Sequence, residues 1–110
     1  MIIRANEWTA HLAATAKDPY FRVHGFITVG NYAYGAVLSR RWRQNSFQEL
    51  DLDLEPKVEY ENGQIIKANA EIQHHLPVEY KINGTYSYTG VNIYVEGSLF
   101  HHISRVVITY

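Results

Sequence analysis

The chain has 110 residues, 10 of them basic and 11 acidic, so its net charge of −1 gives no general attraction to nucleic acid or to anionic membranes. This length suffices for one domain, residues 1–110, with a single hydrophobic core. The chain lacks cysteine, an uninterrupted apolar leader and any run of 18 apolar residues, so it is expected to be a soluble, cytoplasmic protein without disulfides or a membrane span.

The N-terminal segment has the spacing of a short amphipathic helix over about residues 6–17. Asn6 can cap this helix, and three apolar side chains then recur at intervals of four residues on one face: Trp8, Leu12 and Ala16. Pro19 ends the pattern, because proline disfavours the helical conformation in the residue before it. A helix of about three turns is marginal alone, so its apolar face is expected to dock on a sheet.

Residues 20–39 have the pattern of a β-hairpin. Gly30-Asn31 supplies two residues that accept the positive φ of a tight type I′ or II′ turn, and apolar and polar side chains alternate on both arms. Counting outward from the turn gives three apolar cross-strand pairs: Val29 with Tyr32, Ile27 with Tyr34, and Val23 with Leu38. Phe21 extends the same apolar face.

A basic cluster follows the hairpin, and an alternating segment follows the cluster. The cluster consists of Arg40, Arg41, Trp42 and Arg43. In the alternating segment, three leucines (Leu50, Leu52 and Leu54) are interleaved with three acidic residues (Asp51, Asp53 and Glu55). This alternation predicts a strand whose acidic face is solvated.

The Glu61-Asn62-Gly63 segment predicts a second turn, and two registers compete for it. A two-residue turn places Glu59 opposite Ile66, which mixes charge into an apolar row. A three-residue loop with a glycine bulge instead places Val58 opposite Ile66, and this alternative is preferred.

Two further hairpins are expected in the C-terminal half. The first turns at Asn83-Gly84 and places Tyr80 opposite Ser87 and Val78 opposite Thr89. The second turns near His101-His102, where a loop longer than two residues is expected because histidine accepts positive φ less readily than asparagine or glycine.

The successive hairpins predict an all-β fold, an antiparallel meander that closes as a small barrel or a two-sheet sandwich, with one short N-terminal helix. An α+β sheet with the helix across one face is the alternative. The strands are expected at about residues 20–29, 32–40, 47–54, 57–61, 64–74, 77–82, 85–89, 91–100 and 103–110.

One predicted row of side chains combines polar groups with aliphatic neighbours. His74, Tyr80, Ser87 and Thr89 share the inward face of the long hairpin. A cavity with a few convergent polar groups is the usual form of a small-molecule site, so these four form a candidate ligand-binding site, with Tyr34 and Tyr110 as its walls. In the alternative interpretation, the four polar groups satisfy one another.

The opposite face of that hairpin carries Tyr86, Tyr88 and Tyr94, which are candidates for a partner surface because aromatic residues are enriched at interfaces. The cluster Arg40, Arg41, Trp42 and Arg43 is a second candidate surface. Single-stranded nucleic acid is one ligand for it, since arginines bind phosphate while a tryptophan stacks on a base. Pairing of these arginines with the acidic stripe is the alternative.

Two adjacent histidine pairs, His74-His75 and His101-His102, do not have the spacing of a metal site, because neighbours on a strand point to opposite faces. Neither a metal nor a cofactor is expected, and no catalytic motif is present. We therefore expect a non-enzymatic module that binds a small molecule or a protein. A small enzyme with an interior polar pocket and a single-stranded nucleic-acid binder are the alternatives, and an edge strand offers a route to self-association.

Overall fold

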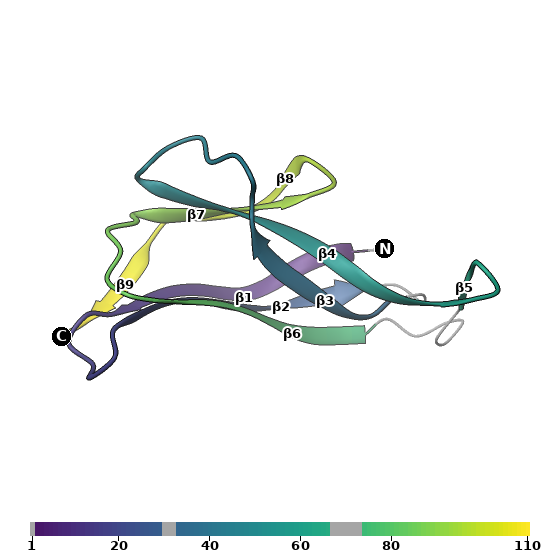
Figure 1. Ribbon diagram of the computed structural model, residues 1–110, viewed down its shortest axis with the longest axis horizontal. Coiled ribbons are helices and arrows are strands. Elements are labelled where there is room, and N and C mark those ends of the chain that lie inside the picture. Colours follow the sequence, from purple (N-terminus) through teal and green to yellow (C-terminus); the bar gives the residue numbers. More distant parts are fainter. Residues whose placement is uncertain (1, 30–32, 67–73) are drawn as a thin grey trace.

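The computed structural model describes residues 2–29, 33–66 and 74–110, and the regular structure in these ranges is entirely β (Figure 1). Nine strands are present: β1 (Ile2–Ala13), β2 (Tyr20–Val29), β3 (Ala33–Arg40), β4 (Glu49–Glu61), β5 (Gln64–Ile66), β6 (His74–Asn83), β7 (Gly90–Val95), β8 (Ser98–Ile103) and β9 (Val106–Thr109). The all-β prediction is confirmed for the described ranges.

The strands form two mixed sheets that lie face to face and do not close into a barrel (Figure 1). One sheet has the order β6-β2-β1-β9, and the other has the order β3-β4-β7-β8 with β5 paired to the end of β4. The β1–β9 and β4–β7 pairs are parallel, and the other pairs are antiparallel. The predicted antiparallel meander is therefore wrong. Of the two alternatives for its closure, the barrel is wrong and two sheets are observed.

The core lies between the two sheets and is built from alternating positions of their central strands. β2 contributes Phe21, Val23, Ile27 and Val29, and β4 contributes Leu50, Leu52 and Leu54, all at most 1% exposed. The predicted alternation in both segments is confirmed. Each buried side chain of this size stabilises the fold by about 1.5 to 3 kcal/mol relative to its exposed state.

The predicted N-terminal helix is wrong, because residues 2–13 form strand β1. Trp8, Ala10 and Leu12 also alternate with polar residues, so the segment satisfies a period of two as well as a period of four. Ala10 and Leu12 are buried, and Trp8 packs against the core as expected, but from a strand. Glu7 has φ 52° at a register shift in the β1–β2 pairing, which is the geometry of a bulge.

The predicted hairpin of residues 20–39 is also wrong in its pairing. β2 lies between β1 and β6, while β3 pairs with β4 in the other sheet. Ile27 faces Ala5 and Leu76 rather than Tyr34. The segment expected as a helix supplies one of the strands that pair with β2, so β3 is left free to join the second sheet. The turn residues 30–32 lie outside the described residues.

The turn at Asn62-Gly63 contains two residues rather than the predicted three-residue bulge. Glu61 faces Gln64 and Glu59 faces Ile66. Asn62 and Gly63 have φ of 52° and 78°, the two positive values that a type I′ turn requires. Figure 1 shows β5 at one end of the molecule. Val58 packs against the core from β4, although Ile66 faces Glu59 instead of it.

Asn83-Gly84 ends a strand but does not join a hairpin. β6 pairs with β2, and residues 84–89 cross to the second sheet, where β7 begins at Gly90. The strand expected over 85–89 is therefore an irregular connection. The backbone N–H of Gly84 donates to the carbonyl of Pro19 at 2.7 Å, which ties this crossing to the β1–β2 connection.

The turn predicted near His101-His102 is wrong, since both histidines lie inside β8. The β7–β8 hairpin turns instead at Glu96-Gly97, whose φ values of 51° and 81° again fit a type I′ turn. Residues 106–109 then leave this hairpin and pair in parallel with β1.

We expect Gly25→Ala to destabilise the protein by about 1 to 3 kcal/mol, because overpacking forces the partly buried ring of Trp8 to move. A Cβ at Gly25 would lie 2.3 Å from Cδ2 of Trp8, whose ring covers this glycine. Gly35→Ala is the matched control, since its Cβ would meet Lys57 Cδ at an ordinary 3.5 Å. Chemical denaturation of both variants tests the packing of Trp8, and equal stability of the two would contradict it.

Candidate interaction surface

The segment between β3 and β4, residues 41–48, carries two aromatic side chains that are almost fully exposed. Trp42 is 98% exposed and Phe47 is 99% exposed, higher fractions than for the other large hydrophobic residues known to be exposed in the described ranges. The sequence singled out Trp42, but Phe47 had no neighbouring pattern that drew attention to it. This segment is called the 41–48 loop below.

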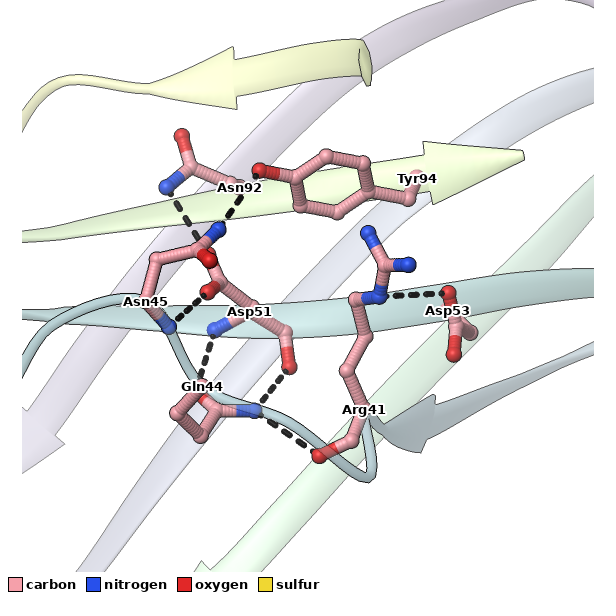
Figure 2. A network of polar contacts seen from close by, with 7 residues as sticks. All are labelled: Arg41, Gln44, Asn45, Asp51, Asp53, Asn92 and Tyr94. Carbon is pink, nitrogen blue, oxygen red and sulfur yellow. Dashed lines mark hydrogen bonds and ion pairs between the residues drawn. The ribbon is translucent and has the colours of Figure 1, made fainter. Parts of the chain in front are cut away.

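The carboxylate of Asp51 binds the loop through Asn45 and also contacts Asn92 (Figure 2). Asp51 lies on the outer face of β4 and is only 1% exposed because the loop covers it. One of its oxygens accepts the backbone N–H of Asn45 at 2.9 Å, and the other accepts the side-chain amide of Asn92 at 3.0 Å. An ionised acceptor strengthens both bonds.

The side-chain amide of Gln44 forms hydrogen bonds to the main chain of β4 in the way that a neighbouring strand would. Its Oε1 accepts the backbone N–H of Asp51 at 2.8 Å, and its Nε2 donates to the carbonyls of Asp51 at 2.8 Å and Arg41 at 3.1 Å. The backbone N–H of Arg41 also donates to the Asp51 carbonyl at 3.0 Å. The loop therefore satisfies main-chain groups of β4 just beyond the end of β3.

Arg41 and Tyr94, both predicted as contact residues, help to support the loop. The guanidinium of Arg41 pairs with Asp53 at 3.3 Å and lies over the ring of Tyr94, 4.1 Å from its centroid. Asn45 donates to the Tyr94 hydroxyl at 3.4 Å. The acidic stripe is thus not a plain solvated face, because Asp51 is buried and Asp53 is paired with an arginine of the basic cluster.

Tyr86 and Tyr88 were predicted to point outward, and this is wrong, because both rings pack against the core. Their rings stack with centroids 5.6 Å apart, and Tyr88 meets the edge of Phe21 at 5.3 Å. Arg40 donates from Nη1 to the Tyr88 hydroxyl at 3.3 Å. Tyr88 therefore joins the core to the exposed guanidinium of Arg40.

Three residues of the predicted ligand-binding site, Tyr80, Ser87 and Thr89, do not line a common pocket in the described structure. Tyr80 is half-buried on the inner face of β6, but Ser87 and Thr89 are exposed on the irregular connection. Burial raises the pKa of the Tyr80 hydroxyl, and the positive charge of Arg40 opposes that rise. Tyr110 is 85% exposed, and the side chains of Tyr34 and His74 lie outside the described part of the chain.

The second histidine pair points to opposite sides of β8, as expected for neighbours on a strand. His101 faces inward, with its ring centroid 6.0 Å from that of Trp8, and burial lowers its pKa. His102 hydrogen-bonds Asn92 at 2.6 Å on the outer face. Among the described residues, no three histidine or carboxylate side chains are grouped so that they can hold a metal ion.

A depression of about 210 Å³ lies at the base of the 41–48 loop. Its lining comes from the loop, the end of β3 and the irregular connection: Arg40, Gln44, Asn45, Ser46, Phe47 and Tyr88. It is the place where an exposed aromatic, a guanidinium and several hydrogen-bonding groups meet.

Comparison with family models, curated proteins and solved structures finds no match to this chain. Within the described ranges, no helix of sufficient length and apolar character to cross a membrane is present. The functional argument therefore rests on the geometry of the surface itself.

We expect Asp51→Ala to lower the free energy of unfolding by about 2 to 3 kcal/mol, because it leaves the Asn45 N–H without its acceptor and leaves the Asn92 amide with only its longer bond to Glu49, at 3.4 Å. Asp53→Ala is the matched control on the same face of β4. Its ion pair with Arg41 is partly exposed, so its loss should cost about 1 kcal/mol or less. Urea denaturation compares the two, and a cost for Asp53→Ala as large as that for Asp51→Ala would contradict the assigned role of Asp51.

Proposed function

We infer that this chain is a non-enzymatic protein-interaction module whose contact surface is the 41–48 loop, with Trp42 and Phe47 as its anchors. The observation that carries this proposal is the almost complete exposure of two large aromatic side chains on a loop that the rest of the structure holds in place. Tryptophan is among the residues most enriched at the energetic centres of protein interfaces.

Burial of these side chains by a partner supplies a large driving force. A buried aromatic side chain removes about 150 to 250 Å² from water, which corresponds to about 4 kcal/mol or more for each ring at about 25 cal/mol per Å². The loss of overall motion on association and the ordering of both side chains reduce this gain. Two such anchors on one loop are nevertheless enough to dominate a small interface.

The anchoring of the loop favours binding because the ordering entropy of its backbone is already lost in the free protein. Gln44 and Asn45 are bound to main-chain and side-chain groups of β4, and Asn45 also contacts Tyr94. These two residues lie between Trp42 and Phe47 in the sequence. A partner then has to order only the two aromatic side chains, which preserves more of the binding free energy.

A protein partner has more support than single-stranded nucleic acid. Arg41, at the centre of the basic cluster, is paired with Asp53, so its charge is largely neutralised inside the chain. Asp51 and Asp53, which lie next to the cluster on β4, leave it with less net positive charge than its sequence suggests, and contacts to phosphates depend on that charge. The small-enzyme alternative loses support because Tyr80, Ser87 and Thr89 do not converge.

The proposal is tested with the double variant Trp42→Ala/Phe47→Ala, immobilised beside the wild type and exposed to an extract of the source cells with and without nuclease treatment. We expect proteins retained by the wild type to be lost from the double variant. With the purified binding protein, the affinity should fall at least tenfold, since anchors of this kind contribute about 2 kcal/mol or more. Thermal stability should be nearly unchanged, because both side chains are exposed.

The control is Tyr60→Ala/Tyr110→Ala, which removes two aromatics that are 66% and 85% exposed outside the loop. This variant should retain the same proteins as the wild type. Equal retention by the loop variant, equal loss in both variants, or retention that disappears on nuclease treatment would each overturn the proposal.

A further inference from the structure

The depression at the base of the 41–48 loop adjoins one of the two aromatic anchors. Phe47 forms one of its walls, and Tyr88 forms another. Tyr88 is fixed by its edge contact with Phe21 and by stacking on Tyr86, so its hydroxyl has a defined position. A partner residue next to the one that packs on Phe47 would therefore meet this depression.

The lining of the depression offers hydrogen-bond donors, because several of its acceptors are already used. The Tyr88 oxygen accepts from Arg40, the Ser46 hydroxyl oxygen accepts from the backbone N–H of Gln48 at 2.9 Å, and Gln44 Oε1 accepts from Asp51. Several donors are still available to a ligand: the hydroxyl hydrogens of Tyr88 and Ser46 and the other N–H groups of Arg40. A ligand that only accepts hydrogen bonds fits this set.

The charge of Arg40 points to the same ligand class. Among the described residues, Arg40 has no carboxylate within ion-pair distance, whereas Arg41 is paired with Asp53 and Arg22 with Glu79. Its guanidinium instead contacts a neutral hydroxyl at 3.3 Å. An ionised carboxylate is an acceptor-only group and the common partner of a guanidinium fork.

We propose that the depression binds an aspartate or glutamate side chain of the partner, beside an apolar residue that packs on Phe47. This inference rests on the proposed function and specifies the partner as an acidic, apolar peptide segment. A phosphate group carries nearly two charges, whereas the depression has one guanidinium in its lining. A single carboxylate matches that charge.

The test begins with a displayed library of random 12-residue peptides selected on the wild-type protein. We expect the selected peptides to carry Asp or Glu next to a large apolar residue. The best sequence is then synthesised with an amidated C-terminus, which excludes recognition of a terminal carboxylate, and in a second form with Gln or Asn replacing the acid. Fluorescence anisotropy should show affinity at least tenfold weaker for the uncharged form.

Variants of the protein locate the carboxylate. Arg40→Met should bind the acidic peptide at least tenfold more weakly than the wild type and should no longer distinguish it from the uncharged form. Arg105→Met, which removes an exposed arginine outside the depression, is the control and should bind as the wild type does. Tyr88→Phe keeps the ring packing and removes only the hydroxyl, so it should give a smaller loss and provides a second test if Arg40→Met folds poorly.

The outcomes separate this inference from the proposed function. Peptides that require Trp42 and Phe47 but carry no acid, or an uncharged form that binds equally well, would overturn the carboxylate site and leave the interaction module standing. If no peptide depends on the two aromatics, or if a 12-nucleotide oligothymidine binds the loop more tightly than any peptide, both proposals fall.

Discussion

The buried carboxylate of Asp51 is the interaction on which the 41–48 loop depends. It joins three elements of the second sheet: its own strand β4, the loop through Asn45, and β7 through Asn92. Burial of a carboxylate destabilises a folded protein unless hydrogen bonds compensate for the lost water. The loop supplies one of these bonds to Asp51, and Asp51 in turn fixes the loop. Gln44 and Asn45 fix the backbone of the loop (Figure 2). Trp42 and Phe47 on the same loop stay exposed and do not pack on the core.

The sequence predicted the faces of individual strands better than their partners. The burial of alternate residues in β2 and β4 follows from a period of two, which is a local property of the chain. Pairing is not local: β2 pairs with β1 and β6, and two strand pairs are parallel, although each neighbouring turn signal favoured a hairpin. Asn83-Gly84 and Glu96-Gly97 illustrate this, since the first ends a strand without a hairpin and the second makes one that was not predicted.

The candidate surface was predicted only in part. The basic cluster drew attention to Trp42, whose side chain is exposed. Pairing of its arginines with the acidic stripe was one alternative, but the pattern did not indicate that Arg41 would pair with Asp53 while Arg40 has no described carboxylate within ion-pair distance. Asp51 looked like its neighbours in an acidic stripe, and only the folding of the loop over β4 distinguishes it. Tyr86 and Tyr88 were assigned to the wrong side because their positions were counted from a hairpin that does not form.

Hydrogen exchange of the Asn45 backbone amide measures most directly whether Asp51 fixes the loop. This N–H donates to the buried carboxylate at 2.9 Å, so it should exchange in the free wild-type protein at least about a hundredfold more slowly than in an unstructured chain. The amide of Leu52 in the centre of the sheet serves as the internal reference for a folded molecule. Exchange of the Asn45 amide at the unstructured rate, with Leu52 still protected, would contradict the account, because the aromatic anchors would then lie on a mobile loop.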